Sequence, residues 1–247
     1  MTTSFPRDWI IPDWPAAANV RAFATTRADG ASRGSYAGMN LAARVGDDQR
    51  AVKENRDALR KHLPAEPIWL EQVHGTAVAD IETARPSARA DGAVARTPRH
   101  VCAVLTADCL PVLFTARSGG IVGVAHAGWR GLAGGIIEAT IERMGLPGAE
   151  VLAWLGPGIS QAAYEVGTDV YESFVRPDPG ARAAFRDRAP GKYQADLYAL
   201  ARRRLRAAGV TAVYGGGLCT YSEPDRFYSY RRDGAATGRM ATLIWMD

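Results

Sequence analysis

The sequence predicts an α+β fold in which mixed β-sheets and helices form layers around one core. Its 247 residues are 47% hydrophobic and 23% charged, a composition that can bury one sizeable core and that excludes disordered, collagen-like and coiled-coil proteins. Strand-like and helix-like segments neither alternate strictly nor separate into two blocks, which favours a layered α+β domain over a doubly wound parallel sheet. No linker rich in Pro, Gly or Ser divides the chain, so we expect a single domain over residues 1–247.

The first half of the chain carries signals for one helix and three strands. Asp47 and Asp48 are N-cap candidates for a helix that Pro64 ends. Apolar residues on one stripe of this helix support it: Val52, Leu59 and Leu63. Three apolar or β-branched runs then predict buried strands over 67–73, 100–106 and 120–125.

The second half carries signals for three helices and three strands. Helical spacing of apolar residues predicts a helix over 131–144, with Gly145 as its C′ residue. A shorter helix is expected over 168–175 with Thr168 as its cap, and a longer one over 193–208, which Gly209 ends. The remaining strands are expected over 151–155, 210–214 and 241–245.

Charge and cysteine content exclude several classes of protein. The net charge is only +4, and the densest arginine cluster, 202–204 with Arg206, lies on the solvated side of a predicted helix, so no nucleic-acid partner is expected. No run approaches the ~20 uncharged apolar residues of a membrane span, and the first residues lack an apolar leader. Three cysteines cannot form a disulfide framework and fit a reducing compartment. We expect a cytoplasmic protein with no membrane partner.

Three residues with metal-binding side chains stand at the ends of predicted strands. His74 follows the run 67–73, Cys109 follows the run 100–106, and His126 follows the run 120–125. If the three strand ends lie in one sheet, two imidazoles and a thiolate converge, which is the ligand set of a catalytic zinc site with one open position. The same proximity equally permits a metal-free Cys109 nucleophile activated by a histidine, and spacing does not separate the two.

Four arginines, one in the middle of the chain and three near its C-terminus, are candidates for binding an anion. Arg130, Arg231, Arg232 and Arg239 have the planar donor fork that suits phosphate or carboxylate. The aromatic pair before Arg231 ends in Tyr228 and is a candidate platform for a purine. The alternative is that Arg231 pairs with Asp225 or Asp233 and only fixes its loop. Cys102, inside an apolar run, is expected in the core, and the glycine run 215–217 is expected to form a close-packed loop rather than a nucleotide cradle.

The ordered motifs of the chain resemble those of the laccase-domain family, also called multicopper polyphenol oxidases or peptidoglycan editing factors. The resemblance runs over nearly the whole chain. The matching segments are Gly38-Met39-Asn40-Leu41, Val45-Gly46-Asp47-Asp48 with Glu54-Asn55-Arg56, Gln72-Val73-His74-Gly75, Ala90-Asp91-Gly92, Thr106-Ala107-Asp108-Cys109-Leu110-Pro111, His126-Ala127-Gly128-Trp129-Arg130-Gly131, Leu155-Gly156-Pro157-Gly158-Ile159, Cys219-Thr220, and Ser229-Tyr230-Arg231-Arg232 with Thr237-Gly238-Arg239-Met240.

This resemblance implies a fold, an activity and a cofactor. The implied fold has two mixed sheets between helices in four α/β/β/α layers, similar to deamidating toxins and cysteine hydrolases. The implied activity is purine nucleoside phosphorolysis of adenosine, inosine, guanosine or methylthioadenosine with phosphate, together with adenosine deamination. The implied metal ligands are His74, Cys109 and His126, holding zinc, with copper binding in vitro. The expected substrate-binding residues are Asn40, Arg130, Tyr228 and Arg231.

The chain departs from the family pattern at two places, and other functions stay open. It has Ala162-Ala163-Tyr164 where many relatives have Cys-Cys-Tyr, and Phe227-Tyr228-Ser229 where Phe-Phe-Ser is common. Four histidines are too few for the copper centres of a multicopper oxidase. The alternatives are a metal-free cysteine hydrolase, or peptidoglycan-editing amidase-like protein, using Cys109, and a non-enzymatic cell-wall quality-control factor. We expect a monomer or weak homodimer.

Overall fold

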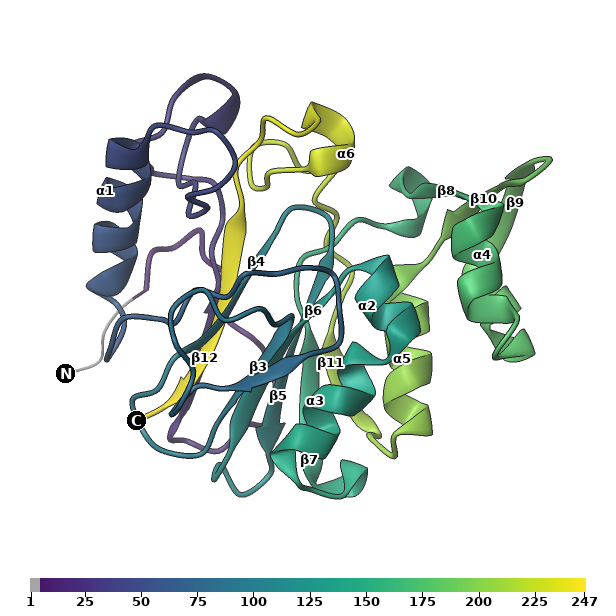
Figure 1. Cartoon of the computed structure of the whole chain (residues 1–247), viewed down its shortest axis with the longest axis horizontal. Helices are drawn as coiled ribbons and strands as arrows, with labels where there is room; N and C mark the ends of the chain where they lie inside the picture. The colour runs from purple at the N-terminus through teal and green to yellow at the C-terminus, as the bar shows by residue number, and fades with distance from the viewer. Residues whose placement is uncertain (1–4) are drawn as a thin grey trace.

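Two β-sheets stacked face to face form the centre of the fold in the computed structural model, which describes residues 5–247 (Figure 1). The larger sheet is mixed, with parallel pairs only at its two edges, β11 with β7 and β2 with β3. Its strands in spatial order are β11 (Ala212–Gly215), β7 (Val151–Leu155), β5 (Leu110–Ala116), β6 (Val122–Ala127), β3 (Gly92–Ala95) and β2 (Val78–Asp80). The smaller sheet is antiparallel: β1 (Val20–Ala24), β12 (Met240–Met246) and β4 (Cys102–Thr106).

Helices cover the outer face of each sheet. The smaller sheet is covered by α1 (Gln49–Arg60), whose Leu59 packs with Phe23 and Leu243. The larger sheet is covered by α2 (Trp129–Gly134), α3 (Ile136–Met144) and α5 (Leu197–Ala207). The α+β fold and the order helix, sheet, sheet, helix are therefore confirmed, although only one of the two central sheets is mixed.

The alternation of side chains along each strand explains this layering. In β4, Cys102 and Val104 face the larger sheet, whereas Ala103 faces α1. In β6, Val124 faces the smaller sheet and Ala125 faces the helices on the other side. Both central sheets are consequently apolar on both faces, which accounts for strand sequences that read as continuous apolar runs.

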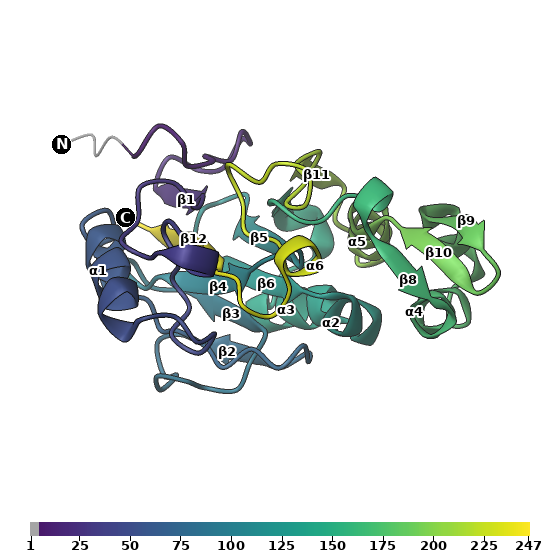
Figure 2. The same cartoon turned by 90° about the horizontal axis from the view of Figure 1, so that it is seen from above.

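A third sheet extends beyond the layered body, and the sequence did not predict it (Figure 2). Its antiparallel strands are β8 (Glu165–Gly167), β10 (Lys192–Ala195) and β9 (Phe185–Ala189). It packs with α4 (Thr168–Val175) and with the 3-10 helix η4 (Pro179–Ala184). Four short segments complete the chain: η1 (Gly34–Tyr36), η2 (Gly148–Glu150), η3 (Gln161–Ala163) and α6 (Tyr230–Asp233).

Most of the predicted elements are confirmed within a few residues. Asp48 caps α1, because its carboxylate accepts the Arg50 backbone N–H at 2.9 Å. The strands predicted over 100–106, 120–125, 151–155, 210–214 and 241–245 correspond to β4, β6, β7, β11 and β12. The helix over 168–175 is α4, but Thr168 is its first helical residue and Gly167 is the cap.

The strand predicted over 67–73 is wrong. Only Glu71 forms a bridge, with Arg89. The segment reaches the edge of β4 through a side chain instead, because the Gln72 amide accepts the Leu105 N–H at 2.7 Å and donates to the Leu105 carbonyl at 2.9 Å. This amide takes the place of a backbone partner, so the segment is extended without being a strand.

Two of the predicted helices are shorter than expected. The helix over 131–144 is interrupted at Gly135, whose φ of +100° is left-handed, so α2 ends there and α3 begins. The helix over 193–208 begins only after Asp196, whose carboxylate accepts the Ala199 N–H at 2.9 Å. Tyr193 lies in β10 and stacks on Tyr171 at 4.2 Å between ring centroids.

No described helix is long and apolar enough to cross a membrane. The expected absence of an apolar leader concerns in part residues 1–4, which lie outside the described residues.

All three cysteines are free, and Cys102 is fully buried in the core, as predicted. The glycines at 215–217 form a left-handed loop, and a side chain at Gly215 would come within 2.5 Å of the Leu155 carbonyl, which confirms the close-packed loop.

Candidate metal centre

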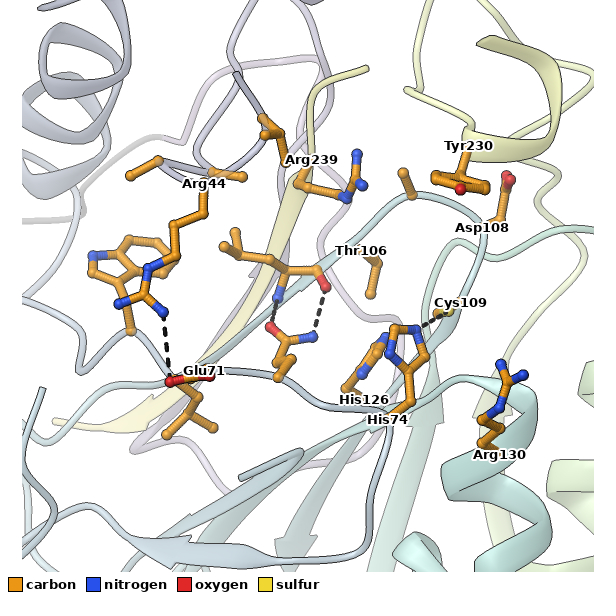
Figure 3. Close-up of a pocket in the computed structure, with 18 of the residues that line it drawn as sticks. Arg44, Glu71, His74, Thr106, Asp108, Cys109, His126, Arg130, Tyr230 and Arg239 are labelled. Carbon is orange, nitrogen blue, oxygen red and sulfur yellow. Dashed lines mark hydrogen bonds and ion pairs between the residues drawn. The ribbon is translucent and has the colours of Figure 1, made fainter. Parts of the chain in front are cut away.

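His74, Cys109 and His126 converge at one point of the fold (Figure 3). Their ligand atoms lie within 4.8 Å of one another, and Cys109 Sγ is 3.7 Å from His74 Nε2. Two ligands of a tetrahedral zinc ion with ordinary Zn–S and Zn–N bonds are about 3.6 Å apart. Two imidazoles and a thiolate at this spacing fit Zn²⁺ as three protein ligands with one open position.

The route by which the three ligands meet differs from the predicted one. His126 is the fifth residue of β6 rather than the residue after it, and its partner across the sheet is Pro111 of β5. Cys109 lies just before β5, in the turn that leads from the smaller sheet to the larger one. His74 lies on the irregular segment beside β4. The prediction of three strand ends in one sheet is therefore wrong, although the three residues do converge.

The Asp91 carboxylate forms hydrogen bonds with both histidines, to the side chain of His126 and to the backbone of His74. It is fully buried, and its Oδ1 lies 2.8 Å from His126 Nδ1 and accepts the His74 backbone N–H at 2.9 Å. Its Oδ2 accepts the backbone N–H groups of Val73 at 3.1 Å and of Gly75 at 2.7 Å. The hydrogen bond from Nδ1 leaves His126 Nε2 free to face Cys109 and His74.

The absence of a side chain at Gly128 leaves room for the side chains of His74 and Cys109. A Cβ at this position would lie 2.8 Å from His74 Cδ2 and 3.0 Å from Cys109 Sγ. The backbone φ of Gly128 is −62°, which any residue adopts, so the requirement for glycine is steric. The motif His126-Ala127-Gly128 therefore supplies one ligand and the room for the other two.

The electrostatics of the trio favour a thiolate. Burial by itself raises the pKa of Cys109, but the charges and hydrogen bonds of His126 and His74 lower it to about 6. Burial likewise lowers the pKa of His126, but the Cys109 thiolate and the Asp91 carboxylate raise it to about 9. Without a metal, Cys109 and His126 thus stabilise one another as a thiolate and an imidazolium. The thiolate is the form that binds metals and acts as a nucleophile, whereas His126 binds a metal only after Nε2 gives up its proton.

The trio opens onto a cavity of about 810 Å³ (Figure 3). Five arginines line it. Arg44 forms an ion pair with Glu71, whereas the other four, Arg56, Arg130, Arg231 and Arg239, form no ion pair with a carboxylate among residues 5–247. Three of these four were predicted from the sequence as anion-binding candidates: Arg130, Arg231 and Arg239. Each of these three guanidinium groups lies over an aromatic ring of the same cavity. The pairs are Arg130 with Trp129 at 4.3 Å, Arg231 with Tyr164 at 5.2 Å, and Arg239 with Tyr230 at 5.9 Å.

The hydrogen bonds of these arginines position them without neutralising them. Arg231 Nη1 donates to the Glu165 carbonyl at 2.7 Å, and Arg239 Nη1 donates to the Thr237 and Gly238 carbonyls. Burial lowers the pKa of Arg239, against the attraction of the Cys109 thiolate and the Asp108 carboxylate. With Arg56, four positive charges without carboxylate partners among the described residues surround one cavity, which is suited to an anion.

Asp108 connects the ligand turn to the helix that carries Arg231. Its φ of +89° is left-handed, and its side chain is buried. One carboxylate oxygen accepts the Thr220 hydroxyl at 2.6 Å, and the other accepts the Arg231 backbone N–H at 2.7 Å. Arg231 therefore does not pair with Asp233, which instead forms its ion pair with Arg232.

Two of the expected substrate-binding residues do not reach the cavity. Asn40 is fully buried. Its side-chain amide donates a hydrogen bond to the Asp47 carboxylate and accepts one from the Arg239 backbone N–H. Tyr228 is also fully buried, and its hydroxyl donates to the Tyr36 and Ala37 carbonyls. Both are corrected to supporting residues, because their polar groups are consumed by loop contacts. Arg130 and Arg231 do line the cavity.

The cavity also has lining residues that sequence analysis did not identify as functional. Trp129, Tyr164 and Tyr230 provide the aromatic surface that was assigned to Tyr228. Trp129 and Tyr230 stand directly beside Arg130 and Arg231 in the sequence, so adjacency to a candidate arginine was an available signal. Asp91 lies behind the trio rather than in the cavity lining, and its membership in the motif Ala90-Asp91-Gly92 was the only sequence signal for a functional role.

Comparisons with known proteins identify the family of this chain. The family described as multi-copper polyphenol oxidoreductase laccase matches residues 21–247. The chain is 52% identical to Purine nucleoside phosphorylase PA4543 of Pseudomonas aeruginosa over 240 residues, covering 97% of this chain and 98% of that protein. It is 48% identical to Purine nucleoside phosphorylase YfiH of Escherichia coli over 241 residues, covering 96% and 98%.

Two solved structures share the fold over almost their full length. The Neisseria meningitidis protein NMB0706 is 50% identical, with a TM-score of 0.94, over 98% of this chain and 100% of that chain. YlmD from Geobacillus stearothermophilus is 33% identical, with a TM-score of 0.91, over 99% and 98%. The likeness thus covers the layered body and the extending third sheet alike.

Proposed function

The chain belongs to the multi-copper polyphenol oxidoreductase laccase family, and on that premise we propose that it is a zinc-dependent purine nucleoside phosphorylase that also deaminates adenosine. The proposal rests chiefly on one observation: a single cavity holds a zinc-type ligand set and four arginines without carboxylate partners among the described residues, of which Arg130, Arg231 and Arg239 are the proposed phosphate ligands. The names of relatives at 48–52% identity support phosphorolysis. The substrates are adenosine, inosine, guanosine and methylthioadenosine, each with phosphate.

The three arginines are the proposed phosphate site. In phosphorolysis a phosphate oxygen forms a bond to the anomeric carbon of the sugar while the bond from that carbon to the purine nitrogen breaks. The purine leaves with the bonding electron pair and takes up a proton, and the sugar leaves as its 1-phosphate. Arg130, Arg231 and Arg239 hold the phosphate dianion and reduce its repulsion from the other negative groups of the cavity.

The aromatic residues of the cavity are the proposed nucleoside site. Trp129, Tyr164 and Tyr230 present ring surface beside the arginines, and a purine stacks on such surface. Tyr230 is 53% exposed, so it lies where a ligand enters. Burial raises the pKa of Tyr164 well above its usual range, so its hydroxyl stays protonated and able to donate a hydrogen bond to the substrate.

Zinc is the metal that the ligand set fits, and we expect the same set to bind Cu²⁺ in vitro because divalent copper generally exceeds zinc in affinity for nitrogen and sulfur ligands. When bound, zinc acts as a Lewis acid that lowers the pKa of a coordinated water and stabilises negative charge on the substrate. His126 presents Nε2 because Asp91 occupies Nδ1. Cys109 presents a thiolate because His126 and His74 lower its pKa.

Product analysis with and without phosphate tests the proposal. Zinc-loaded protein is incubated with adenosine, and the purines are separated by chromatography. The expected products are adenine only when phosphate is present and inosine whether or not phosphate is present. His126→Ala is the matched control, because it removes a ligand of the trio. Product levels equal to those of this variant for both reactions would overturn the proposal.

A cysteine hydrolase is the second candidate, and the low pKa of Cys109 beside His74 favours it. Element analysis together with alkylation separates the two functions. One zinc per chain that is lost in Cys109→Ala supports the phosphorylase. Metal-free active protein that loses an amidase activity when Cys109 is alkylated supports the hydrolase.

A further inference from the structure

The Asp91 side chain contacts two of the proposed metal ligands at once: the imidazole of His126 and the backbone of the segment that carries His74. Its two oxygens receive three backbone N–H groups, from residues 73, 74 and 75, and the Nδ1 side of His126. The carboxylate has no exposed surface. All of its interactions are therefore directed at the ligand segments, and none at solvent.

The register of the sheet places Asp91 in this position. In the pairing of β3 with β6, Gly92 lies opposite Ala125, and the ladder continues one step further with the His126 N–H donating to the Asp91 carbonyl at 2.6 Å. The neighbour Gly92 leaves room for Thr140 and Val78, which a Cβ would approach to 3.1 Å. Backbone pairing thus fixes the Asp91 side chain beside His126 independently of any metal.

The turn that carries His74 needs such a partner. His74 has a φ of +60°, a left-handed conformation that costs energy for a residue other than glycine. In this turn three successive N–H groups donate to the same carboxylate, and such a concave set of donors favours binding of an anion. The Asp91 carboxylate is that anion, so it offsets the strain that places His74 Nε2 3.7 Å from Cys109 Sγ.

We propose that Asp91 is the positioning residue of the metal centre, which sets the His126 tautomer and fixes the His74 turn with the same carboxylate. This inference rests on the metal centre of the proposed function and not on the reaction it performs. Asp91 touches no substrate, so its effect appears first in metal affinity. A partner that orients a ligand in this way typically contributes about 10- to 100-fold to metal affinity.

The substitution Asp91→Asn separates the two roles because an amide has only one acceptor oxygen. If the oxygen faces His126, it still accepts the His74 N–H, but the amide NH₂ meets the N–H groups of Val73 and Gly75, and the His74 turn loses two of its three acceptor contacts. If the NH₂ faces His126, then Nδ1 must accept a hydrogen bond, the imidazole proton moves to Nε2, and that nitrogen no longer binds metal. Either orientation weakens the centre.

The experiment measures zinc affinity of the full chain by competition with a chromogenic chelator. The variants are Asp91→Asn, the conservative Asp91→Glu and the control Asp47→Asn. Asp47 is a suitable control because its carboxylate also receives several hydrogen bonds, from Ser32, Asn40 and its neighbour, but it lies outside the cavity lining. Melting of the zinc-free proteins is measured in parallel.

The expected result is a zinc dissociation constant raised about 10- to 100-fold in Asp91→Asn, with Asp91→Glu in between and Asp47→Asn unchanged. If Asp91→Asn does not fold, Asp91→Glu carries the test, because it keeps the charge and moves the oxygens. Wild-type affinity in a folded Asp91 variant, or an equal loss in Asp47→Asn, would overturn the inference alone. A wild-type chain that binds no zinc would overturn the proposed function with it.

Discussion

Replacing Arg231 by Ala tests the phosphate site most selectively. The guanidinium lies over Tyr164, uses Nη1 for the Glu165 carbonyl, and has no carboxylate partner, so Nε and Nη2 remain for phosphate. Removal of the guanidinium is expected to cost at least one charge-assisted hydrogen bond, which contributes about 1.5–3 kcal/mol. At about 1.4 kcal/mol per tenfold change, the Michaelis constant for phosphate rises about 10- to 150-fold. Phosphate-independent deamination of adenosine stays near the wild-type rate.

The neighbouring Arg232→Ala is the matched control for this experiment. Arg232 pairs with Asp233 and donates to the carbonyls of Thr220, Tyr221 and Phe227, so its loss loosens the loop without removing a cavity charge. This control is expected to lower the melting temperature and both activities together. Arg231→Lys is expected to recover little, because an ammonium cannot reproduce two directed hydrogen bonds. An unchanged phosphate dependence in Arg231→Ala would refute the assignment.

Three further predictions concern the metal centre, the core and pH. Gly128→Ala is expected to weaken zinc binding more than about tenfold in a chelator competition, because the new Cβ meets His74 and Cys109; unchanged affinity would contradict the steric account. Phe114→Ala, fully buried at the centre of β5, is expected to lower the free energy of unfolding by about 3–5 kcal/mol in urea, and a loss below about 1 kcal/mol would contradict its core position. Burial beside Trp9 and the charge of Lys61 lower the pKa of His62, so the unfolded chain binds the proton more readily and stability falls as pH drops below about 6.5. The melting temperature of His62→Phe is expected to fall less than that of wild type between pH 7.5 and 5, and an equal fall would contradict this.

Elements whose signals are local were predictable from the sequence. The α1 helix has its own cap in Asp48 and an apolar stripe, and the buried strands β4, β6, β7 and β12 are continuous apolar runs. The strand prediction for 67–73 failed because the apolar residues of this segment pack without strand pairing. Its contact with β4 is made by the Gln72 side chain, which bonds to the backbone of Leu105, 33 residues away. Periodicity contains no information on such a long-range partner.

In the site, too, local features were predictable from the sequence and long-range contacts were not. The trio was predictable because His and Cys are rare in this chain and each of the three residues stands close to Gly or Pro in the sequence. Asn40 and Tyr228 were misplaced because a motif shows that a residue matters without showing whether its polar atoms face a ligand or a loop. The role of Asp91 depends on the register of β3 with β6, which no local pattern encodes.

The central claim is that the trio and the arginines act in one reaction, and a zinc titration of the zinc-free protein tests it most directly. The measurement follows ribose 1-phosphate formed from adenosine and phosphate as zinc is added. The account predicts that the rate rises linearly to one zinc per chain and then stays constant, and that His126→Ala shows no rise. A rate that is independent of zinc, or the absence of ribose 1-phosphate at full zinc loading, would contradict the account.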